Sequence, residues 1–377
     1  MAKPILLFQR VIPSYRKAIF EKLYDQLNII TCFSAEARPS GLSTEETQAK
    51  WNLKIGKLKL GSRRTNVIQN FISPMKLHRP KILITEFSLG YLTFWFLWLF
   101  KPIFRYKLIL WTHGVNNKEI FAPFTKPSRK LALWFMKNAD AVIFYSRKRR
   151  DAVAQKAKRE EGYFVAFNTI DTDTLNEIFV KLKDKGKHVI KTELGFTSKY
   201  NIIYVGQLKE DKRLDILLYA FQLLSTDLDI QLHIIGSGAE EKRIREAMLL
   251  NKKINYYGAI FDDSIVGKYL LASDLMVMSG YLGLSVVHSF AFGLPIISCR
   301  STQTGPFHSP EAEYIVDGEN GIFCDFNANA VAESIRSTLL NNNALENMAE
   351  NALFTAYNTC KIEKMLEGFE SAIKYVS

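Results

Sequence analysis

The chain has 377 residues, more than one hydrophobic core usually fills, so two α/β domains are expected. Its hydrophobic content of 47% and charged content of 23% are those of a globular protein and exclude a disordered chain. The four cysteines show no paired short spacing, which excludes a disulfide framework or a zinc site and indicates reduced thiols in the cytoplasm.

The net charge of +12 is divided unevenly along the chain. Residues 1–190 carry 34 Lys and Arg against 15 Asp and Glu, whereas residues 191–377 carry 16 against 23. The first half is therefore +19 and the second −7, which sum to +12. Such asymmetry predicts that the two halves meet different partners.

Short apolar runs recur along the chain, and each is followed by a segment with helical periodicity. Because the runs are continuous rather than alternating, they predict strands buried on both faces in parallel sheets. Two such series predict two doubly wound, Rossmann-like domains. The predicted strands are 4–9, 28–33, 81–85, 107–111, 141–145, 163–167, 201–205, 230–235, 253–257, 274–278, 294–298 and 321–324.

We expect an N-terminal domain over 1–175, a polar, Lys-rich linker over 176–199 and a C-terminal domain over 200–358. Residues 359–377 are expected to form a helix that packs back on the first domain. The chain begins directly in a strand-like run, so no signal peptide is expected. The most apolar stretch, 89–100, is shorter than the about 20 residues that a membrane-spanning helix needs.

Parallel sheets bind ligands at the carboxyl ends of their strands, so the cleft between two such domains is the predicted active site. The strand at 201–205 opens through Gly206 into a loop with Lys209 and Lys212 before a helix. A Gly that permits close approach, a helix N-terminus and two cations suit a diphosphate. A plain strand–helix turn with solvated lysines is the alternative.

Two further glycine-rich segments follow later strands. Gly236 and Gly238 lack the third glycine of a dinucleotide fingerprint, and alone they indicate only a turn. Residues 279–289 place small residues at a strand end and offer backbone N–H groups to a phosphate. His288 is expected about two turns into the following helix, where a core histidine is the alternative.

The order of these segments resembles glycosyltransferase family 4, retaining enzymes of the GT-B fold. That family has Gly-Arg-Leu with a later Lys, then Gly-x-Gly, then two glutamates around Gly-Phe-Gly-Leu, then Ala-x-Gly-x-Pro. Its closing Glu-Ile-Val-x-x-Gly-x-x-Gly is similar to residues 313–321, which begin at Glu313. The resemblance covers most of the chain and is strongest from 201 to 324.

Three positions depart from the family pattern. Gln207 replaces the phosphate-facing Arg, which leaves Lys212 as the better cation, and the paired glutamates fall on Gly280 and His288. His288 can hydrogen-bond a ribose hydroxyl, whereas Gly280 cannot replace a carboxylate. An inactive homologue or partner subunit is therefore one alternative. A sugar-nucleotide epimerase of the same fold is another, although its chemistry needs a carboxylate acid/base set.

The first domain carries its own part of the resemblance. Residues 12–16 are similar to a Pro-His-Tyr-Arg element, which implies that Tyr15 and Arg16 face an acceptor; a surface turn is the alternative. His113 follows a strand and precedes a Gly, and the resemblance places it against the donor sugar. Residues 167–171 are similar to a closing Asn-x-x-Asp element and are interpreted mainly as structural.

The resemblance implies a glycosyltransferase that uses a nucleotide-diphosphate sugar and retains the anomeric configuration. Lys212 and His113 are the predicted catalytic residues. Lys212 would stabilise the departing diphosphate, which dominates this chemistry, and His113 would position the sugar. No cofactor is expected, and no metal either, since no carboxylate cluster suits Mg²⁺. The predicted donor-binding residues are Gly206, Gln207, Lys209, Lys212, Gly236, Gly238, Ala259, Ile260, Gly283, Leu284, Ser285, His288 and Glu313.

The basic half suits an acceptor carried on an anionic surface. Basic residues crowd 147–159, and an aromatic run at 91–100 either lies at an interface or forms a buried helix. We therefore expect a cytoplasmic protein, peripheral on the inner face of a bacterial membrane, that extends a glycan or lipid-linked glycan in surface polysaccharide synthesis. Nucleic-acid binding is the rival interpretation, but no helix-turn-helix, zinc-finger or RNA-recognition motif is present.

Overall fold

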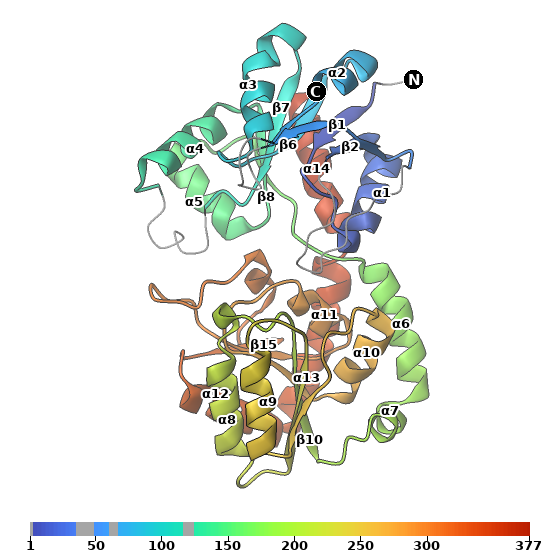
Figure 1. The fold of residues 1–377 in the computed structure, drawn as a ribbon, viewed down its shortest axis with the longest axis vertical. Coiled ribbons are helices and arrows are strands. Elements are labelled where there is room, and N and C mark those ends of the chain that lie inside the picture. The colour runs from blue at the N-terminus through green and yellow to red at the C-terminus, as the bar shows by residue number, and fades with distance from the viewer. Residues whose placement is uncertain (1–2, 35–48, 60–66, 116–123) are drawn as a thin grey trace. The chain divides into compact units, whose positions relative to one another are not determined.

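The computed structural model describes residues 3–34, 49–59, 67–115 and 124–377. The chain forms two compact units (Figure 1). Unit 1 contains residues 1–171 and 362–377, and unit 2 contains residues 172–361. Each unit is a parallel sheet with helices on both faces, so the predicted pair of Rossmann-like domains is confirmed.

The sheet of unit 1 has seven strands in the order β3-β2-β1-β6-β7-β8-β9, all paired in parallel. Every strand predicted in this half is present. Three strands of three residues each were not predicted, because so short a strand gives no periodicity. The strands are β1 (Ile5–Phe8), β2 (Ile29–Phe33), β3 (Asn52–Lys54), β6 (Ile82–Glu86), β7 (Lys107–Thr112), β8 (Ala141–Phe144), β9 (Tyr163–Val165) and the antiparallel pair β4 (Lys57–Lys59) and β5 (Val67–Gln69).

Successive side chains of each strand enter opposite cores, as the period of two in a strand requires. Leu6 and Phe8 pack on one face with residues of α3 and α4. Leu7 packs on the other face with residues of α1 and α14. The helices of unit 1 are α1 (Lys17–Leu27), α2 (Ile72–His78), α3 (Leu92–Phe104), α4 (Pro127–Asn138), α5 (Arg147–Ala157) and α14 (Ile362–Val376), with a short 3₁₀ turn η1 (Ser14–Arg16).

The last helix, α14, completes the core of unit 1. The ring of Phe369 lies 5.0 Å from that of Trp111 in β7. Gly368 allows the helix to approach β9, because a Cβ atom there would overlap the carbonyl group of Val165. The side chain of Lys22 in α1 pairs with Glu363 at 2.6 Å.

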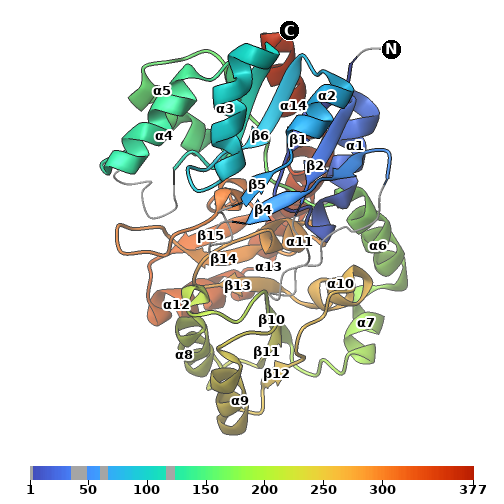
Figure 2. The same ribbon diagram turned by 45° about the horizontal axis from the view of Figure 1, so that its top comes forward.

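The sheet of unit 2 has six parallel strands in the order β12-β11-β10-β13-β14-β15 (Figure 2), all of them predicted. They are β10 (Tyr200–Val205), β11 (Ile230–Ile235), β12 (Ile254–Tyr256), β13 (Leu275–Met278), β14 (Ile296–Cys299) and β15 (Gly321–Cys324). The helices are α6 (Thr172–Lys185), α7 (Lys187–Glu193), α8 (Leu214–Leu224), α9 (Glu241–Leu250), α10 (Asp263–Ala272), α11 (Ser285–Ala291), α12 (Ala328–Leu340) and α13 (Asn342–Phe354), with the single turns η3 (Glu210–Lys212), η4 (Pro310–Tyr314) and η5 (Thr355–Thr359).

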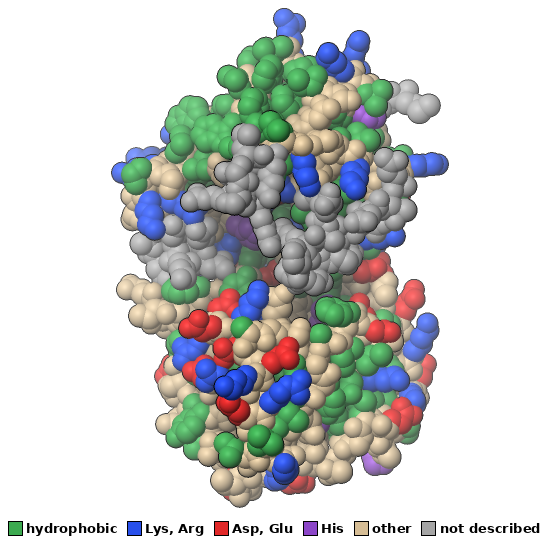
Figure 3. All heavy atoms as spheres, in the orientation of Figure 1, with side chains coloured by type: hydrophobic (Ala, Val, Ile, Leu, Met, Phe, Trp, Pro, Cys, Tyr) green, Lys and Arg blue, Asp and Glu red, His purple; other side chains and the backbone are tan. Residues whose placement is uncertain are grey.

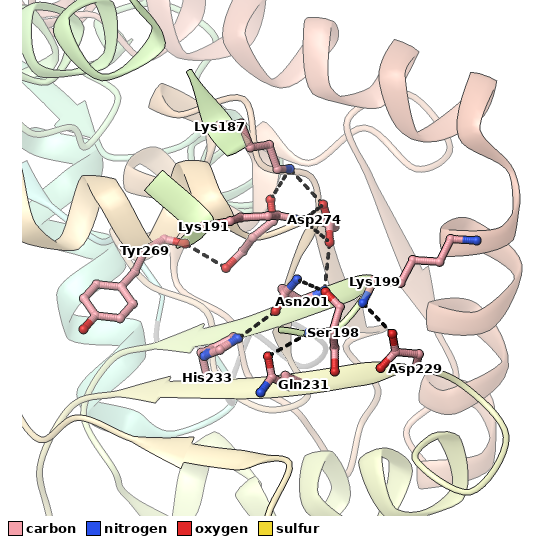
Figure 4. A network of polar contacts seen from close by, with 11 residues as sticks. Lys187, Lys191, Ser198, Lys199, Asn201, Asp229, Gln231, His233, Tyr269 and Asp274 are labelled. Carbon is pink, nitrogen blue, oxygen red and sulfur yellow. Dashed lines mark hydrogen bonds and ion pairs between the residues drawn. The ribbon is translucent and has the colours of Figure 1, made fainter. Parts of the chain in front are cut away.

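The segment 176–199 differs from the linker expected there, because most of it lies in α6 and α7 of unit 2. Phe179 and its neighbours on one face of α6 are buried, and the lysines occupy the other face. In α7, Lys187 pairs with Asp274 at 2.8 Å, and Asp274 accepts a hydrogen bond from the N–H of Asn201 at 2.8 Å (Figure 4). These contacts fasten α7 to the amino end of β10, so the lysines belong to the second domain.

Helix α3 carries the aromatic run of the first half. Its Phe94 and Leu97 are fully buried, whereas Leu99 and Ile103 are exposed by 66% and 68%. The helix is therefore neither wholly buried nor wholly at the surface. At 13 residues α3 is too short to span a bilayer, and no other helix in the described ranges meets the length and apolarity for a span.

Candidate functional site

The loops that follow β10, β11 and β12 lie side by side at the carboxyl edge of the unit 2 sheet. The backbone N–H of Leu208 donates to the carbonyl oxygen of Ser237 (2.9 Å), and that of Gly236 donates to Gly258 (2.7 Å). These loops contain predicted donor-binding residues. The structure therefore brings together segments that were separate in the sequence.

Close packing between these loops explains two of the glycines. A Cβ atom on Gly236 would overlap the carbonyl oxygen of Gly206, and one on Gly238 would overlap that of Leu208. Only glycine permits such an approach of backbone to backbone. Both glycines thus have a structural function, and contact of either with a donor stays a prediction.

Four other predicted donor residues lie at the rim of this edge. Gln207, Lys209 and Ala259 are exposed, and Ile260 is half-buried. The backbone carbonyl of Gln207 accepts a hydrogen bond from the hydroxyl of Tyr204 (2.8 Å), which leaves the Gln207 side chain at the surface. Their roles in donor binding stay predictions.

Lys212 is the predicted cation that the structure places most firmly. Only 9% of the residue is exposed, and its Nζ donates to the carbonyl oxygen of Tyr281 (2.7 Å) and lies 4.6 Å from the centre of that ring. Burial lowers the pKa of Lys212 to about 8, although the charges of Asp211 and Glu311 oppose that shift. A lysine with this pKa is charged at neutral pH but is poorly compensated, so an added anion would stabilise it.

The loop between β13 and α11, which contains Tyr281, presents further backbone donors. Leu282 donates its N–H to Nδ1 of the buried His308 (3.2 Å), which fixes the loop just before the helix. In the described chain, the N–H groups of Gly283, Leu284 and Ser285 have no hydrogen-bond partner, and all three residues are half-exposed. Free N–H groups at a helix start can bind an anion, and contact of these three residues with a donor stays a prediction.

Gly280, which stands where the family has its first glutamate, is in close contact with the turn that carries Lys212. A Cβ atom there would overlap the carbonyl groups of Asp211 and Lys212. The N–H of Tyr281 also donates to the carbonyl oxygen of Asp211 (2.8 Å). No side chain fits at position 280 unless this turn moves, so the missing carboxylate is replaced by direct packing of two backbone segments.

His288 has a partner that the sequence did not indicate. Its Nε2 lies 3.0 Å from Oδ1 of Asp263, the first residue of α10, and both side chains are partly exposed. His288 is therefore not a core histidine. The pair returns a carboxylate to the place where the family has its second glutamate, and only the spacing between helices, not a local motif, brings the two together.

A buried carboxylate near Lys212 was also missed. Glu311 in η4 is 2% exposed, and Ser309 donates its hydroxyl to this carboxylate. The charge of Glu311 raises the pKa of Lys212, so the two groups interact electrostatically. Glu313, the predicted residue two positions later in the same turn, is half-buried. The Ser-Pro-Glu sequence is typical of a helix start, so it gave no indication that the carboxylate of Glu311 is buried.

In unit 1, His113 lies just after β7 among aromatic and basic side chains. Its ring stacks on Tyr145 with 4.4 Å between centroids, and its Nδ1 lies 3.2 Å from Nη1 of the buried Arg149. Because a guanidinium can only donate, Nδ1 accepts and the ring proton lies on Nε2. The residue has an exposed edge, but desolvation by surrounding protein and the charges of Arg149 and Arg16 lower the pKa of His113 to about 3.

This neutral histidine leads to a test by pH. The wild-type protein should show no acid limb of kcat/KM near pH 6.5, because His113 stays neutral as pH falls to about 3. Arg149→Met removes one of the two positive charges, so the pKa of His113 rises and an acid limb should appear as the ring protonates. Identical pH profiles for the two proteins would show that Arg149 does not control His113.

The two predicted acceptor residues differ in their exposure to solvent. Tyr15 is exposed, whereas Arg16 is buried and donates to the side-chain oxygen of Asn168 (2.7 Å) and to the hydroxyl of Tyr145 (3.4 Å). Arg16 also lies over the Trp111 ring at 5.5 Å. Its guanidinium thus stabilises unit 1, and acceptor binding through either residue stays a prediction.

Comparison with known proteins bears on the family and the fold. Residues 187–353 match the family model "Glycosyl transferases group 1". The chain is 23% identical over 276 residues to N-acetyl-alpha-D-glucosaminyl L-malate synthase of Bacillus anthracis, with 71% of this chain and 67% of that protein covered.

Two solved structures share the fold along nearly the whole chain. HepE of Anabaena in complex with UDP superposes with a TM-score of 0.71 at 14% identity, covering 98% of this chain and 99% of that one. WaaG, a glycosyltransferase involved in lipopolysaccharide biosynthesis, superposes with a TM-score of 0.62 at 14% identity and 98% coverage of both chains. Residues 187–353 are thus a group 1 glycosyltransferase segment, and these likenesses together show a glycosyltransferase of the GT-B type that acts on nucleotide sugars.

Proposed function

We propose that this enzyme binds the diphosphate of its donor between Lys212 and the start of α11. One observation carries the proposal: the buried Lys212 donates to the carbonyl oxygen of Tyr281, in the loop that also offers the free N–H groups of residues 283–285. Both kinds of donor are fixed before the reaction, and such groups act where negative charge grows on the departing diphosphate. Retention of the anomeric configuration, as in the resembling family, needs no protein nucleophile in this scheme.

In this proposal His113 donates its Nε2–H to a hydroxyl of the transferred sugar, and the His288–Asp263 pair contacts the ribose. Glu313 lines the sugar side of the same site. We propose that no metal or other cofactor takes part, since Lys212 and the backbone would hold the diphosphate directly. Uridine nucleotides are the first donors to test, because HepE was crystallised with UDP.

For the acceptor we propose a glycan or lipid-linked glycan at the cytoplasmic face of a bacterial membrane, in synthesis of a surface polysaccharide such as O-antigen or capsule. The strong positive charge of residues 1–190 supports an anionic surface, and WaaG offers a precedent in lipopolysaccharide biosynthesis. An epimerase is not favoured, because position 280 has no room for an acid/base side chain.

A thermal-shift screen against UDP-, GDP- and dTDP-sugars tests donor binding. The correct donor should raise the melting temperature in proportion to its affinity, since a ligand that binds only the folded state stabilises it. Nucleotide diphosphate should then be released in the presence of acceptor. Donor binding without release under any acceptor would favour an inactive homologue, and no binding of any nucleotide sugar would overturn the proposed site.

A further inference from the structure

A cavity of about 600 Å³ opens in unit 1 at the amino ends of its strands. Lys3 lies just before β1 and Lys81 immediately before β6. The two arginines follow the last residues of α2 and α3. Among the residues that the structure describes, no acidic side chain lines it. Its five cations are Lys3, Lys76, Arg79, Lys81 and Arg105.

These five cations have no acidic partner among the residues described, and all of them are exposed. Positive charge near a helix C-terminus is favourable, which accounts for the two arginines that cap α2 and α3. It does not account for Lys3 and Lys81, which lie before strands. A concave site with charge of one sign raises the local concentration of the opposite ion, so the cavity suits an anion.

An exposed apolar face borders this cavity. On α3, Trp95, Leu99 and Ile103 follow one another at four-residue intervals and are exposed. On α4, Trp134 is 51% exposed, and its ring lies 5.9 Å from that of Trp98 on α3. Figure 3 shows hydrophobic side chains gathered over α3 and α4.

The cavity and the apolar face are continuous, because Ile103 belongs to both and Phe104 also lines the cavity. A cluster of cations beside exposed Trp, Leu and Ile matches an anionic amphiphile: a phosphate for the cations and hydrocarbon for the apolar face. A soluble anion would leave the apolar face in water, and a neutral apolar partner would leave the five charges uncompensated.

We propose that this surface docks the protein on a bilayer containing anionic glycerophospholipid, with a lipid phosphate in the cavity and the α3–α4 face among the acyl chains. The inference rests on the membrane attachment in the proposed function and identifies its site. It does not depend on sugar transfer.

Two of the cations in the basic cluster at 147–159 are engaged within the protein. Arg149 is buried against His113, and Arg159 donates to the backbone carbonyl groups of Lys137 (2.9 Å) and Ala139 (2.8 Å). These guanidinium groups are engaged within unit 1. The cavity between α2 and α3 is distinguished from that cluster by the apolar face that borders it.

Vesicle flotation tests the charged part of the surface. The wild-type protein should bind phosphatidylcholine vesicles that contain about one third phosphatidylglycerol much more tightly than pure phosphatidylcholine vesicles. Arg79→Ala/Arg105→Ala should weaken binding to the anionic vesicles by about tenfold to thirtyfold. The control Lys54→Ala/Lys57→Ala removes the same charge from exposed lysines of unit 1 away from the cavity. Equal losses in both variants would mean general charge attraction and overturn the site.

A second pair of variants tests the apolar part. Leu99→Ser/Ile103→Ser should reduce vesicle binding at least tenfold and leave a larger salt dependence, since only the electrostatic part remains. Leu249→Ser/Leu250→Ser removes two apolar residues that are more exposed still, from α9 in unit 2, and should change nothing. If the α3 variant binds vesicles as well as the wild type, insertion of this face is refuted.

Two further readouts separate the possible failures. Titration with inorganic phosphate identifies a soluble anion: saturation by phosphate at the cavity without vesicle binding would overturn the lipid proposal. The nucleotide-sugar thermal shift and the unfolding temperature, measured on the same variants, should match the wild type. If the wild-type protein binds its donor but does not bind anionic vesicles, the proposed docking surface is refuted and the proposed donor site is not.

Discussion

Replacing Lys212 by methionine should lower kcat/KM by about 10²- to 10³-fold, the loss expected when one preorganised donor to a developing negative charge is removed. Methionine retains the apolar stem in this buried position, so the fold should survive. Lys252→Met, a change at an exposed lysine of the same unit, is the control and should retain full activity. Undiminished turnover in the Lys212 variant would remove Lys212 from the mechanism.

The same lysine fixes the direction of a pH dependence. Its pKa of about 8 means that the charged form, which the diphosphate requires, is lost as pH rises through 8. At pH 9 only about one molecule in ten keeps the charge in the free enzyme. Donor affinity, measured by titration calorimetry, should therefore fall toward tenfold per pH unit above 8. The methionine variant should bind weakly with no such alkaline decline.

Gly280→Ala should be much more harmful than Gly283→Ala, although both glycines lie in one loop. A Cβ atom at 280 overlaps the backbone of the Lys212 turn, so we expect the free energy of unfolding to drop by about 1–3 kcal/mol and donor binding to be lost. A Cβ atom at 283 meets nothing closer than the Tyr281 ring at 3.9 Å, and alanine keeps the N–H group.

Urea unfolding and the donor thermal shift measure this contrast. The Gly283 variant should stay within about 0.5 kcal/mol of the wild type and still bind donor. Restoring the family glutamate by Gly280→Glu should fail for the same steric reason. If Gly280→Ala is as stable as Gly283→Ala and binds donor equally well, the two backbone segments are not packed as described, and the account of the lost carboxylate is wrong.

The strands were predictable because their signal is local. Residues such as Ile202 and Ile203 are adjacent in sequence and both fully buried, as a strand covered on two faces requires. The helical nature of 176–199 was hidden by its many lysines. Leu175, Phe179 and Leu182 do recur at helical spacing, but the many lysines between them favoured the interpretation of a polar linker.

Only those site residues that directly follow a strand in the sequence could be predicted. Lys212 and the start of α11 follow strands in sequence, so the parallel sheet brings them to one edge. Asp263 pairs with His288 across 25 positions, and Arg16 meets Asn168 across 152, distances over which no local pattern acts. Burial of Arg16 and the carboxylates beside His288 and Lys212 therefore emerged only from the fold.

The discontinuity of unit 1 bears on how the molecule is made. A ribosome that has synthesised residues 1–171 has produced a sheet whose Trp111 still lacks the Phe369 side chain that packs against it. Unit 2 is contiguous, so it can fold on emergence, whereas unit 1 must wait for α14 with part of one apolar face uncovered. Nascent chains halted before α14 should therefore recruit holdase chaperones through their earliest-made domain.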